Sequence, residues 1–313
     1  MKITSPESKI EFLDSKHLDN GTERTPNIKA WQLRLAKTGF QTVGRLFPKF
    51  MAQQAYKIFS TPRWRARHKQ PDDIILAAKV VDLPFDGHTI KLYEWANADS
   101  DKIVLLAHGW ESRGTALRMY VEPLLEKGYK VVAFDALAHG DSGGKQNNLM
   151  INARTISAIY DYYGGIYAAI GHSFGCSSLV YAQQFVNNKI HFERLVFLAV
   201  PHRTRQIMEG FFGYIAVPKS VQRAFFNHIE GLTKQPIDTS DVALAYPSVK
   251  VGKLLLVHDR KDEVTTIDAA ERVVEHWHNA KLLVTEGYGH FRIAKNPDVI
   301  RRIVIFLTTD DTE

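Results

Sequence analysis

The chain has 313 residues, of which 45% are hydrophobic and 24% are charged, and its formal net charge at pH 7 is +6. This length and composition indicate a globular protein with one large core, or with one core and a small accessory segment. The single cysteine, Cys176, excludes an internal disulfide, and no segment approaches the roughly 20 apolar residues that span a bilayer. Because residues 1–7 also lack the apolar core of a secretory signal, we expect a cytoplasmic protein.

The first 75 residues are predicted to form a basic helical arm. Ten Lys or Arg and no Asp or Glu lie between Pro26 and Gln70, so this stretch carries +10 and the remainder −4. Apolar side chains recur at roughly helical spacing among these charges: Trp31, Leu35, Phe40, Val43, Phe47, Phe50, Met51 and Phe59. The pattern suits an amphipathic helix on anionic lipid at the inner face of the membrane, or a pair of helices packed on the catalytic body. Nucleic acid is a weaker alternative, supported only by charge and by the run Arg63-Trp64-Arg65-Ala66-Arg67.

Beyond the arm, eight apolar segments are predicted as strands: 76–83, 89–94, 102–107, 130–134, 166–171, 194–200, 253–258 and 281–285. Helical periodicity fills intervals between the later strands: 114–127, 152–163, 174–187, 266–278 and 297–307. This alternation predicts a mainly parallel sheet with helices on both faces. The first two strands should pair antiparallel, because only the turn Phe85-Asp86-Gly87 joins them.

A candidate oxyanion-binding loop follows the predicted strand 102–107. The strand ends in His108-Gly109-Trp110, where the chain could present a backbone N–H. Acyl transfer places negative charge on the former carbonyl oxygen, and fixed N–H donors stabilise that charge. The candidate donors are the amides of Trp110 and Phe174.

A candidate nucleophile lies between the predicted strand 166–171 and the helix that follows. Residues 171–175 read Gly-His-Ser-Phe-Gly, a G-x-S-x-G pattern. Glycines on both sides of Ser173 allow a sharp turn that lifts the hydroxyl clear of the sheet. The alternative is an ordinary glycine-bounded turn with a solvated serine. Cys176 lacks the turn position and is expected to be a packing residue.

The last two predicted strands are followed by candidates for an acid and a base. After 253–258, three acidic residues compete to orient the base: Asp259, Asp262 and Glu263. We favour Asp262, because a residue several positions past the strand end can fold back across the sheet. After 281–285, Gly287 and Gly289 give a flexible approach to His290, which completes the order Ser, Asp, His.

With these residues in place, the stretch from Ile75 to Leu307 resembles the α/β-hydrolase family of serine esterases, lipases and related acyl hydrolases. The segment Val132 to Gly143 is similar to the strand-four signature of that family, an aspartate followed by a His-Gly-x-Ser turn, which usually shapes the site without doing chemistry. Ala138 and Asp259 stand where many members carry glycine, which bears on loop shape and substrate preference. Ser173 argues against the haloalkane dehalogenase and epoxide hydrolase branches, which have aspartate there. The resemblance implies the α/β-hydrolase fold, in a catalytic domain over 76–313.

About fifty residues separate the strands that end near Val200 and begin near Lys253, and we expect a cap insertion at about 202–250. Its apolar residues suit two short helices separated at Pro218: Met208, Phe211, Phe212, Tyr214, Ile215, Val217, Phe225, Phe226 and Ile229. Most should pack the cap on the body, and a minority should line an acyl pocket for short or medium chains.

These features predict a serine hydrolase that cleaves carboxylic esters with an apolar acyl or alcohol part, without metal or cofactor. Ser173 is the nucleophile, His290 the base and Asp262 the acid that orients it, and the Trp110 and Phe174 amides hold the oxyanion. Thioester, lysophospholipid and monoacylglycerol hydrolysis would use the same machinery. An inactive binding module is a less favoured alternative, since a fold does not guarantee an activity.

Overall fold

The computed structural model describes residues 9–13, 30–67, 70–97, 100–201 and 203–309. The chain forms two compact units, which we call the sheet unit and the helical unit. The sheet unit comprises residues 1–18, 62–202 and 242–313, and the helical unit comprises 19–61 and 203–241. Most of the predicted arm is therefore grouped with most of the predicted cap.

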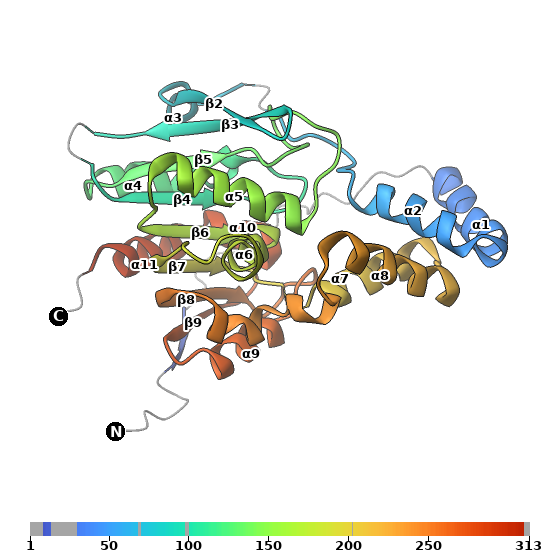
Figure 1. Cartoon of the computed structure of the whole chain (residues 1–313). Coiled ribbons are helices and arrows are strands. Elements are labelled where there is room, and N and C mark those ends of the chain that lie inside the picture. The colour runs from blue at the N-terminus through green and yellow to red at the C-terminus, as the bar shows by residue number, and fades with distance from the viewer. Residues whose placement is uncertain (1–8, 14–29, 68–69, 98–99, 202, 310–313) are drawn as a thin grey trace. The chain divides into compact units, whose positions relative to one another are not determined.

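The described part of the sheet unit contains one nine-stranded sheet, in the order β1-β9-β8-β7-β6-β4-β5-β3-β2 (Figure 1). Its strands are β1 (Ile10–Phe12), β2 (Lys79–Phe85), β3 (His88–Trp95), β4 (Ile103–Ala107), β5 (Lys130–Phe134), β6 (Ala168–His172), β7 (Phe192–Leu198), β8 (Val251–Asp259) and β9 (Ala280–Thr285). β3 pairs antiparallel with both β2 and β5, and the other neighbours run parallel. The mainly parallel sheet and the antiparallel first pair are confirmed.

The sequence did not predict β1. This strand has three residues and pairs with β9, with Ile10 opposite Leu282. None of its side chains is buried, so no apolar run marks it in the sequence. All eight predicted strands overlap observed ones, and the prediction of eight strands missed this short edge strand.

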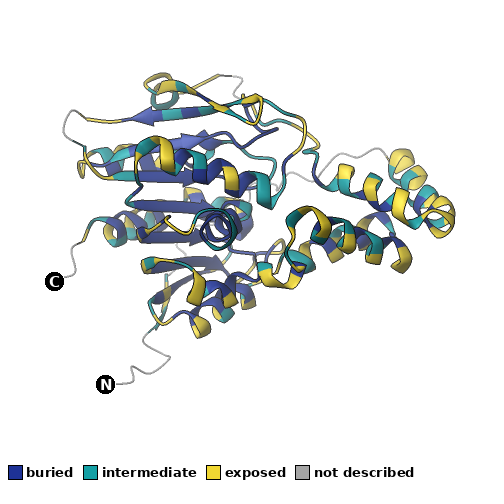
Figure 2. Cartoon of the chain, in the orientation of Figure 1, coloured by how far each residue is buried: buried dark blue, intermediate teal, exposed yellow. Residues whose placement is uncertain are grey.

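Helices cover both faces of the sheet, as predicted. Successive residues of β4 point to opposite faces: Leu105 belongs to one buried cluster and Leu106 to the other. The first cluster includes buried side chains of α5 (Leu149–Tyr163), α6 (Phe174–Tyr181) and α9 (Asp268–His276), and the second includes those of η2 (Gly114–Tyr120), α4 (Val121–Leu125) and α11 (Pro297–Thr308). Figure 2 shows the resulting pattern, with buried strands and helices that are exposed on their outer sides.

The described sheet unit also contains two irregular helical stretches, three short helices and one further 3₁₀ segment. The predicted helix 114–127 is a 3₁₀ segment, η2, followed by α4, and the predicted helix 174–187 continues from α6 into a π-helix, η3 (Ala182–Val186). The short helices are α3 (Asp73–Leu76), α10 (Gly289–Arg292) and the 3₁₀ helix η6 (Ile293–Lys295), and a further 3₁₀ segment, η5, spans Val242–Ser248.

The helical unit is built from α1 (Ala30–Leu46), α2 (Pro48–Phe59), α7 (Thr204–Ile215), α8 (Lys219–Thr233) and the 3₁₀ helix η4 (Ile237–Ser240). α7 and α8 are the two helices predicted on either side of Pro218. Phe40 of α1 is buried in one apolar cluster with Phe212 of α7 and Phe225 of α8. The Gln41 side chain donates a hydrogen bond to the Ala216 carbonyl at 2.7 Å.

This shared core accounts for most of the apolar residues of the predicted cap and for Phe40 of the predicted arm. Six of the nine apolar residues named in the predicted cap are buried within the cluster of the helical unit: Met208, Phe212, Ile215, Val217, Phe225 and Ile229. Buried side chains of α1 and α2 lie in the same cluster as those of α7 and α8, so the two pairs of helices share one core. Among the described helices, none is both long enough and apolar enough to cross a bilayer.

Candidate active site

Ser173 lies at the sharp turn between β6 and α6. Its backbone has φ 51° and ψ −115°, a strained conformation for a residue with a side chain. The Ser173 amide donates to the Leu198 carbonyl at 2.9 Å, and the Ser173 carbonyl accepts from the Cys176 amide at 2.9 Å. The turn is therefore held from both sides, as a nucleophile elbow requires.

The two glycines of this motif are needed for a different reason from the predicted one. The left-handed angle belongs to Ser173, whereas neither Gly171 nor Gly175 has a positive φ. A Cβ on Gly171 would lie 2.9 Å from the Cys176 backbone nitrogen, and one on Gly175 would lie 2.2 Å from the Ala107 carbonyl oxygen. The glycines allow helix α6 and strand β4 to approach the turn, and the serine itself adopts the strained angle.

His290 and Asp262 are brought together from loops that are distant in sequence. The His290 Nδ1 atom lies 2.8 Å from Asp262 Oδ2, and both residues are buried. The other carboxylate oxygen of Asp262 accepts hydrogen bonds from the amides of Val264 and Thr265, each at 2.8 Å. The Thr265 hydroxyl also donates to Asp262 Oδ2, at 3.0 Å. Asp262 is thus fixed in orientation, and the sequence analysis did not identify the contribution of Thr265.

His290 is tied to the elbow through the residue that precedes the serine. The ring of His172 donates from Nε2 to the His290 carbonyl at 2.8 Å, and the centroids of the two rings are 5.0 Å apart. Among the described residues, no hydrogen bond joins Ser173 to His290, and such contacts commonly tighten only when substrate binds. Because Nδ1 of His290 faces Asp262, Nε2 is the nitrogen available to the serine.

The environment keeps Asp262 ionised and His172 neutral. Burial acts to raise the pKa of Asp262, but the hydrogen bonds from His290 and from the Thr265 amide hold it below its ordinary value. Burial lowers the pKa of His172 to about 4. A neutral His172 adds no positive charge beside His290, so the full attraction of Asp262 is available to an imidazolium at His290.

Asp259, which competed with Asp262 in the sequence analysis, has a different role in the structure. Its carboxylate accepts hydrogen bonds from the Thr285 hydroxyl at 2.7 Å and from the amides of Lys261, Gly287 and Tyr288 at 2.9 to 3.0 Å. These donors belong to both loops that carry Asp262 and His290. Asp259 joins the two loops and makes no hydrogen bond with His290 in the described structure. The third competitor, Glu263, is exposed.

The loop after β4 brings Trp110 close to the start of α6. The rings of Trp110 and Phe174 are in contact, with centroids 5.4 Å apart. Phe174 is the first residue of α6, and the first N–H groups of a helix have no acceptor within that helix. The two predicted oxyanion donors therefore belong to neighbouring segments beside Ser173. That their amides bind an oxyanion remains a prediction.

Three contacts that the sequence did not reveal hold this loop in place. The Glu111 amide donates to Nε2 of His139 at 3.0 Å, and the His139 ring lies against Trp110 with centroids 4.9 Å apart. The Glu111 carboxylate accepts from the Arg63 amide at 2.7 Å and from two nitrogens of the Arg63 guanidinium at 2.8 and 2.6 Å. The Gly114 amide donates to Asp135 at 2.8 Å.

The segment after β5 is held by hydrogen bonds to a buried aspartate. Buried Asp135 also accepts hydrogen bonds from the Asp141 amide at 2.8 Å and from the Tyr93 hydroxyl at 2.9 Å. Ala138, which stands where many family members have glycine, adopts a left-handed φ of 65°.

Cys176 is buried with a raised thiol pKa, consistent with a packing residue rather than a nucleophile. Among the described residues, no cluster of His, Cys, Asp and Glu could hold a metal ion.

Comparison with known proteins agrees with the fold. Solved structures with similar folds include an esterase from Pyrococcus furiosus, which is 25% identical with a TM-score of 0.57, covering 79% of this chain and 95% of that one. A thioesterase domain from the curacin biosynthetic pathway is 18% identical with a TM-score of 0.55, covering 74% of this chain and 100% of that one. A bacterial membrane phospholipase A described as a virulence factor is 16% identical with a TM-score of 0.57, covering 90% of this chain and 98% of that one.

No curated protein sequence matches the chain significantly. A family model described as "Alpha/beta hydrolase family" matches residues 104–303, a range that contains all five candidate site residues. The chain therefore belongs to the α/β-hydrolase family.

Proposed function

We propose that this chain is a serine hydrolase that cleaves carboxylic esters through an acyl-enzyme. The proposal rests mainly on one observation: the His290–Asp262 pair is connected through His172 to a strained serine turn. A strained nucleophile with an oriented base beside it is the arrangement that acyl transfer needs.

In the proposed reaction, Nε2 of His290 takes the Ser173 proton while Oγ bonds to the substrate carbonyl carbon. Asp262 stabilises the resulting imidazolium through Nδ1, and the Trp110 and Phe174 amides stabilise the oxyanion. His290 then donates its proton to the leaving alkoxide, and the alcohol departs from an acyl-Ser173. Water attacks this ester by the same route and restores the free serine, with His290 acting again as base and then as acid.

The substrate class is proposed as esters with apolar acyl or alcohol parts, because aromatic rings lie beside the candidate site: Trp110 contacts Phe174, and Phe291 contacts His290. Phe291 lies next to His290, with ring centroids 4.9 Å apart, and is 48% exposed. Burial of an apolar substrate group against such rings contributes about 0.8 kcal/mol for each CH₂. Thioester and lysophospholipid hydrolysis remain alternatives that use the same chemistry.

Labelling with a fluorophosphonate probe tests this proposal, together with hydrolysis of nitrophenyl esters of rising chain length, an acyl-CoA and a lysolipid. The wild-type protein should be labelled and should hydrolyse the nitrophenyl esters, and Ser173→Ala should lose both properties. Cys176→Ala, three residues further along, is the matched control and should keep both. Labelling that persists in Ser173→Ala would exclude this nucleophile, and an unlabelled wild-type protein would favour an inactive binding module. Faster turnover of the acyl-CoA or the lysolipid than of the nitrophenyl esters would change the proposed substrate class to thioesters or lysophospholipids.

A further inference from the structure

The helical unit exposes apolar side chains where a surface helix is normally polar. On α1, Phe40 and Gly44 are buried, and a Cβ on Gly44 would lie 3.0 Å from the Val221 side chain of α8. A helix advances about 100° for each residue, so Trp31, Leu35 and Leu46 lie on the opposite side of α1 from Phe40. These three side chains are 62%, 68% and 76% exposed. The solvent side of α1 therefore carries large apolar groups that the packing of the unit does not need.

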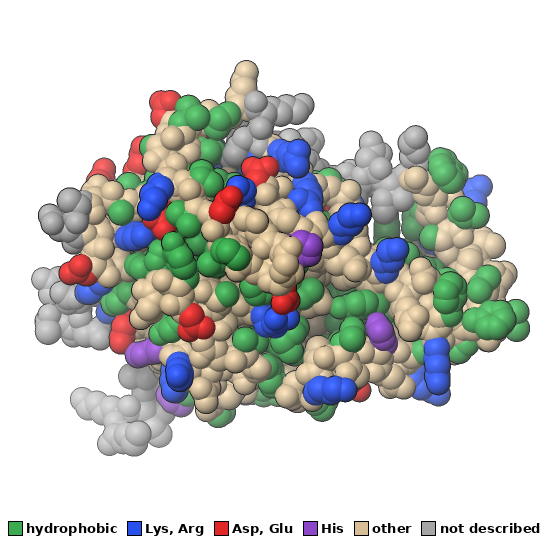
Figure 3. Space-filling view, turned by 45° about the horizontal axis from the view of Figure 1, so that its top comes forward, with side chains coloured by type: hydrophobic (Ala, Val, Ile, Leu, Met, Phe, Trp, Pro, Cys, Tyr) green, Lys and Arg blue, Asp and Glu red, His purple; other side chains and the backbone are tan. Residues whose placement is uncertain are grey.

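The exposed apolar surface continues around the corner between α1 and α2. Phe47 joins the two helices and is 61% exposed, and Phe50 lies in the first turn of α2 and is 55% exposed. We call the five side chains of Trp31, Leu35, Leu46, Phe47 and Phe50 the apolar ridge. Figure 3 shows hydrophobic side chains on the surface at the right-hand end of the view, with Lys and Arg side chains among them. Several large apolar side chains exposed on one pair of helices are typical of an interaction site.

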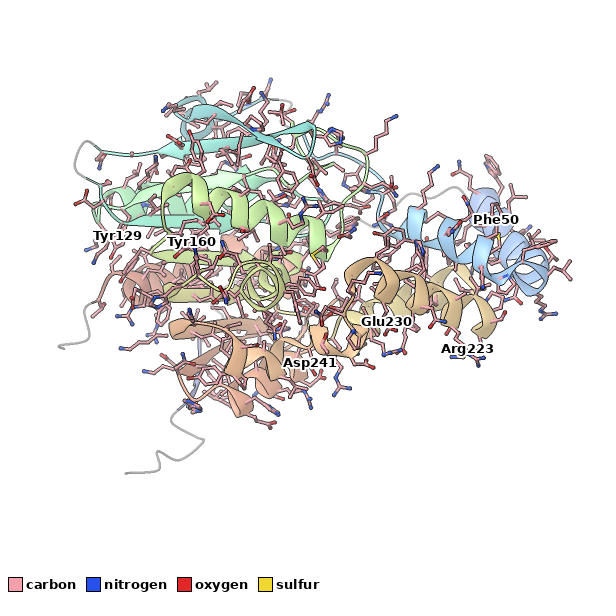
Figure 4. The ribbon with its side chains drawn as sticks, viewed as in Figure 1. Phe50, Tyr129, Tyr160, Arg223, Glu230 and Asp241 are labelled. Carbon is pink, nitrogen blue, oxygen red and sulfur yellow. The ribbon has the colours of Figure 1, made fainter. Side chains whose placement is uncertain are left out.

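In the segment of the chain that carries the apolar ridge, every charged residue is basic. Between residues 30 and 61 there are five basic residues and no acidic one: Arg34, Lys37, Arg45, Lys49 and Lys57. The acidic residues of the described helical unit all come from 203–241, where Asp238 and Asp241 pair with Arg205 and Arg203. In Figure 4, Phe50 lies toward one end of the helical unit and Asp241 toward the other.

Basic residues of α8 add to this charge near the corner. Pro218, at the start of α8, packs against α1, since its Cγ atom lies 3.7 Å from where a Cβ on Gly44 would be. Lys219 follows directly and is exposed, as is Arg223 one turn later. Counting both segments, the described helical unit has ten basic and four acidic residues, a net charge of +6. The apolar ridge is thus part of a positively charged unit.

We propose that the apolar ridge and its basic neighbours bind the anionic surface of a phospholipid bilayer. The aromatic and leucine side chains would enter the boundary between headgroups and acyl chains, while Arg45 and Lys49 meet the lipid phosphates. A second copy of the chain would bring the same positive charge against the ridge, and a nucleic acid would leave the ridge in water. An anionic bilayer satisfies both the apolar groups and the charge. Binding is peripheral, because no described helix could cross the membrane.

Co-sedimentation of the full-length protein with vesicles tests the proposal. The vesicles are phosphatidylcholine alone, or phosphatidylcholine mixed with phosphatidylglycerol. Binding should require phosphatidylglycerol and should weaken as salt rises from about 0.1 M to about 1 M, which shortens the Debye length from about 10 Å to about 3 Å. Equal, negligible binding in all four conditions overturns the proposal.

Paired substitutions separate the apolar and the charged contributions. Phe47→Ser/Phe50→Ser should lower the partition coefficient at least about tenfold, and Arg45→Gln/Lys49→Gln should lower it about thirtyfold at low salt. The matched apolar control is Leu232→Ser, because Leu232 is also an exposed apolar residue on a helix of this unit. The charge control is Lys145→Gln/Lys189→Gln, because these two exposed lysines lie on the sheet unit. Both controls should bind as the wild type does. Ester turnover and thermal unfolding of every variant report whether the fold is retained.

Two further outcomes would also contradict the proposal. If Phe47→Ser/Phe50→Ser leaves vesicle binding unchanged while Arg45→Gln/Lys49→Gln lowers it, the protein binds vesicles by charge alone and the apolar ridge has another role. If vesicles do not bind, but sedimentation shows a dimer that Phe47→Ser/Phe50→Ser abolishes, the ridge is an interface between two copies of this chain.

Discussion

Replacement of Asp262 and of Asp259 by asparagine, one at a time, should separate two roles. Asp262 orients His290, whereas Asp259 joins the loop that carries His290 to the loop that carries Asp262. Asp262→Asn should lower kcat about 10⁴-fold, or about 5 kcal/mol in activation free energy, because an asparagine amide would hold the imidazole of His290 in the wrong tautomer. Asp259→Asn leaves the contact between His290 and Asp262 untouched, so its direct effect on the chemistry should be small. Its main effect should be on the free energy of unfolding.

The hydrogen bonds of Asp259 give the size of that effect. Oδ1 accepts from the amides of Lys261 and Gly287, and Oδ2 accepts from the Thr285 hydroxyl and the Tyr288 amide. If the asparagine keeps its oxygen at the Oδ1 position, the Thr285 hydroxyl can rotate to accept, and only the buried Tyr288 N–H loses its partner. An unsatisfied buried donor costs about 1–3 kcal/mol. The opposite orientation would leave two amides unpaired and is less favourable.

Urea unfolding and nitrophenyl-ester kinetics measure both variants. Asp259→Asn should lose about 1–3 kcal/mol of unfolding free energy and keep much more activity than Asp262→Asn, whose stability should also be measured. Glu263→Gln is the control, since Glu263 is exposed beside the same pair. A folded Asp259→Asn protein that is as inactive as Asp262→Asn, or an active Asp262→Asn protein, would refute the assignment of the two roles.

Two other predictions follow from the packing of the sheet unit. Gly175→Ala should be strongly destabilising or prevent folding, because its Cβ would lie 2.2 Å from the Ala107 carbonyl oxygen. The control is Gly128→Asn, which should be tolerated because Gly128 has a left-handed φ and open space around it. Soluble yield and thermal unfolding of the two variants test this. Burial lowers the pKa values of three histidines, to about 4 for His108 and His172 and about 3 for His139, from 6.5. As pH falls below 6.5, these histidines therefore bind protons in the unfolded chain but stay neutral in the folded chain. The free energy of unfolding should then fall by up to about 1.4 kcal/mol per pH unit for each histidine until pH reaches about 4. Unfolding free energies that stay constant between pH 7 and about 5 would contradict this.

The sequence predicted the sheet well because its strands are continuous buried runs, with turn residues between them. Strands such as β4 and β8 carry apolar side chains on both faces, which distinguishes them from surface segments. β1 lacked that signal because none of its residues is buried. The helical unit was harder to predict, because the amphipathic patterns of α1 and α8 show that each helix packs on something but not on what.

The candidate triad was predictable for a related reason. Ser173, Asp262 and His290 each follow a recognisable strand, and the carboxyl ends of parallel strands meet at one edge of a sheet. The residues that hold them were not predictable, since Thr265 and Asp259 act through hydrogen bonds that depend on how two loops fold. An aspartate in place of a common glycine was the available signal for Asp259.

The proposed oxyanion loop shows how such supporting contacts bear on activity. Glu111 follows Trp110 directly and has a left-handed φ of 55°, an uncommon angle for a residue with a side chain. The conformation is maintained by His139, which accepts from the Glu111 amide, and by Arg63, which binds its carboxylate. The pKa of His139 is lowered by burial to about 3, so this histidine remains an acceptor at neutral pH. Donors held in place before substrate arrives need no reorganisation during the reaction, which is the main source of their contribution to catalysis. His139 and Arg63 thus hold the loop that carries Trp110, and on the prediction that the Trp110 amide binds an oxyanion they are positioning residues for that donor.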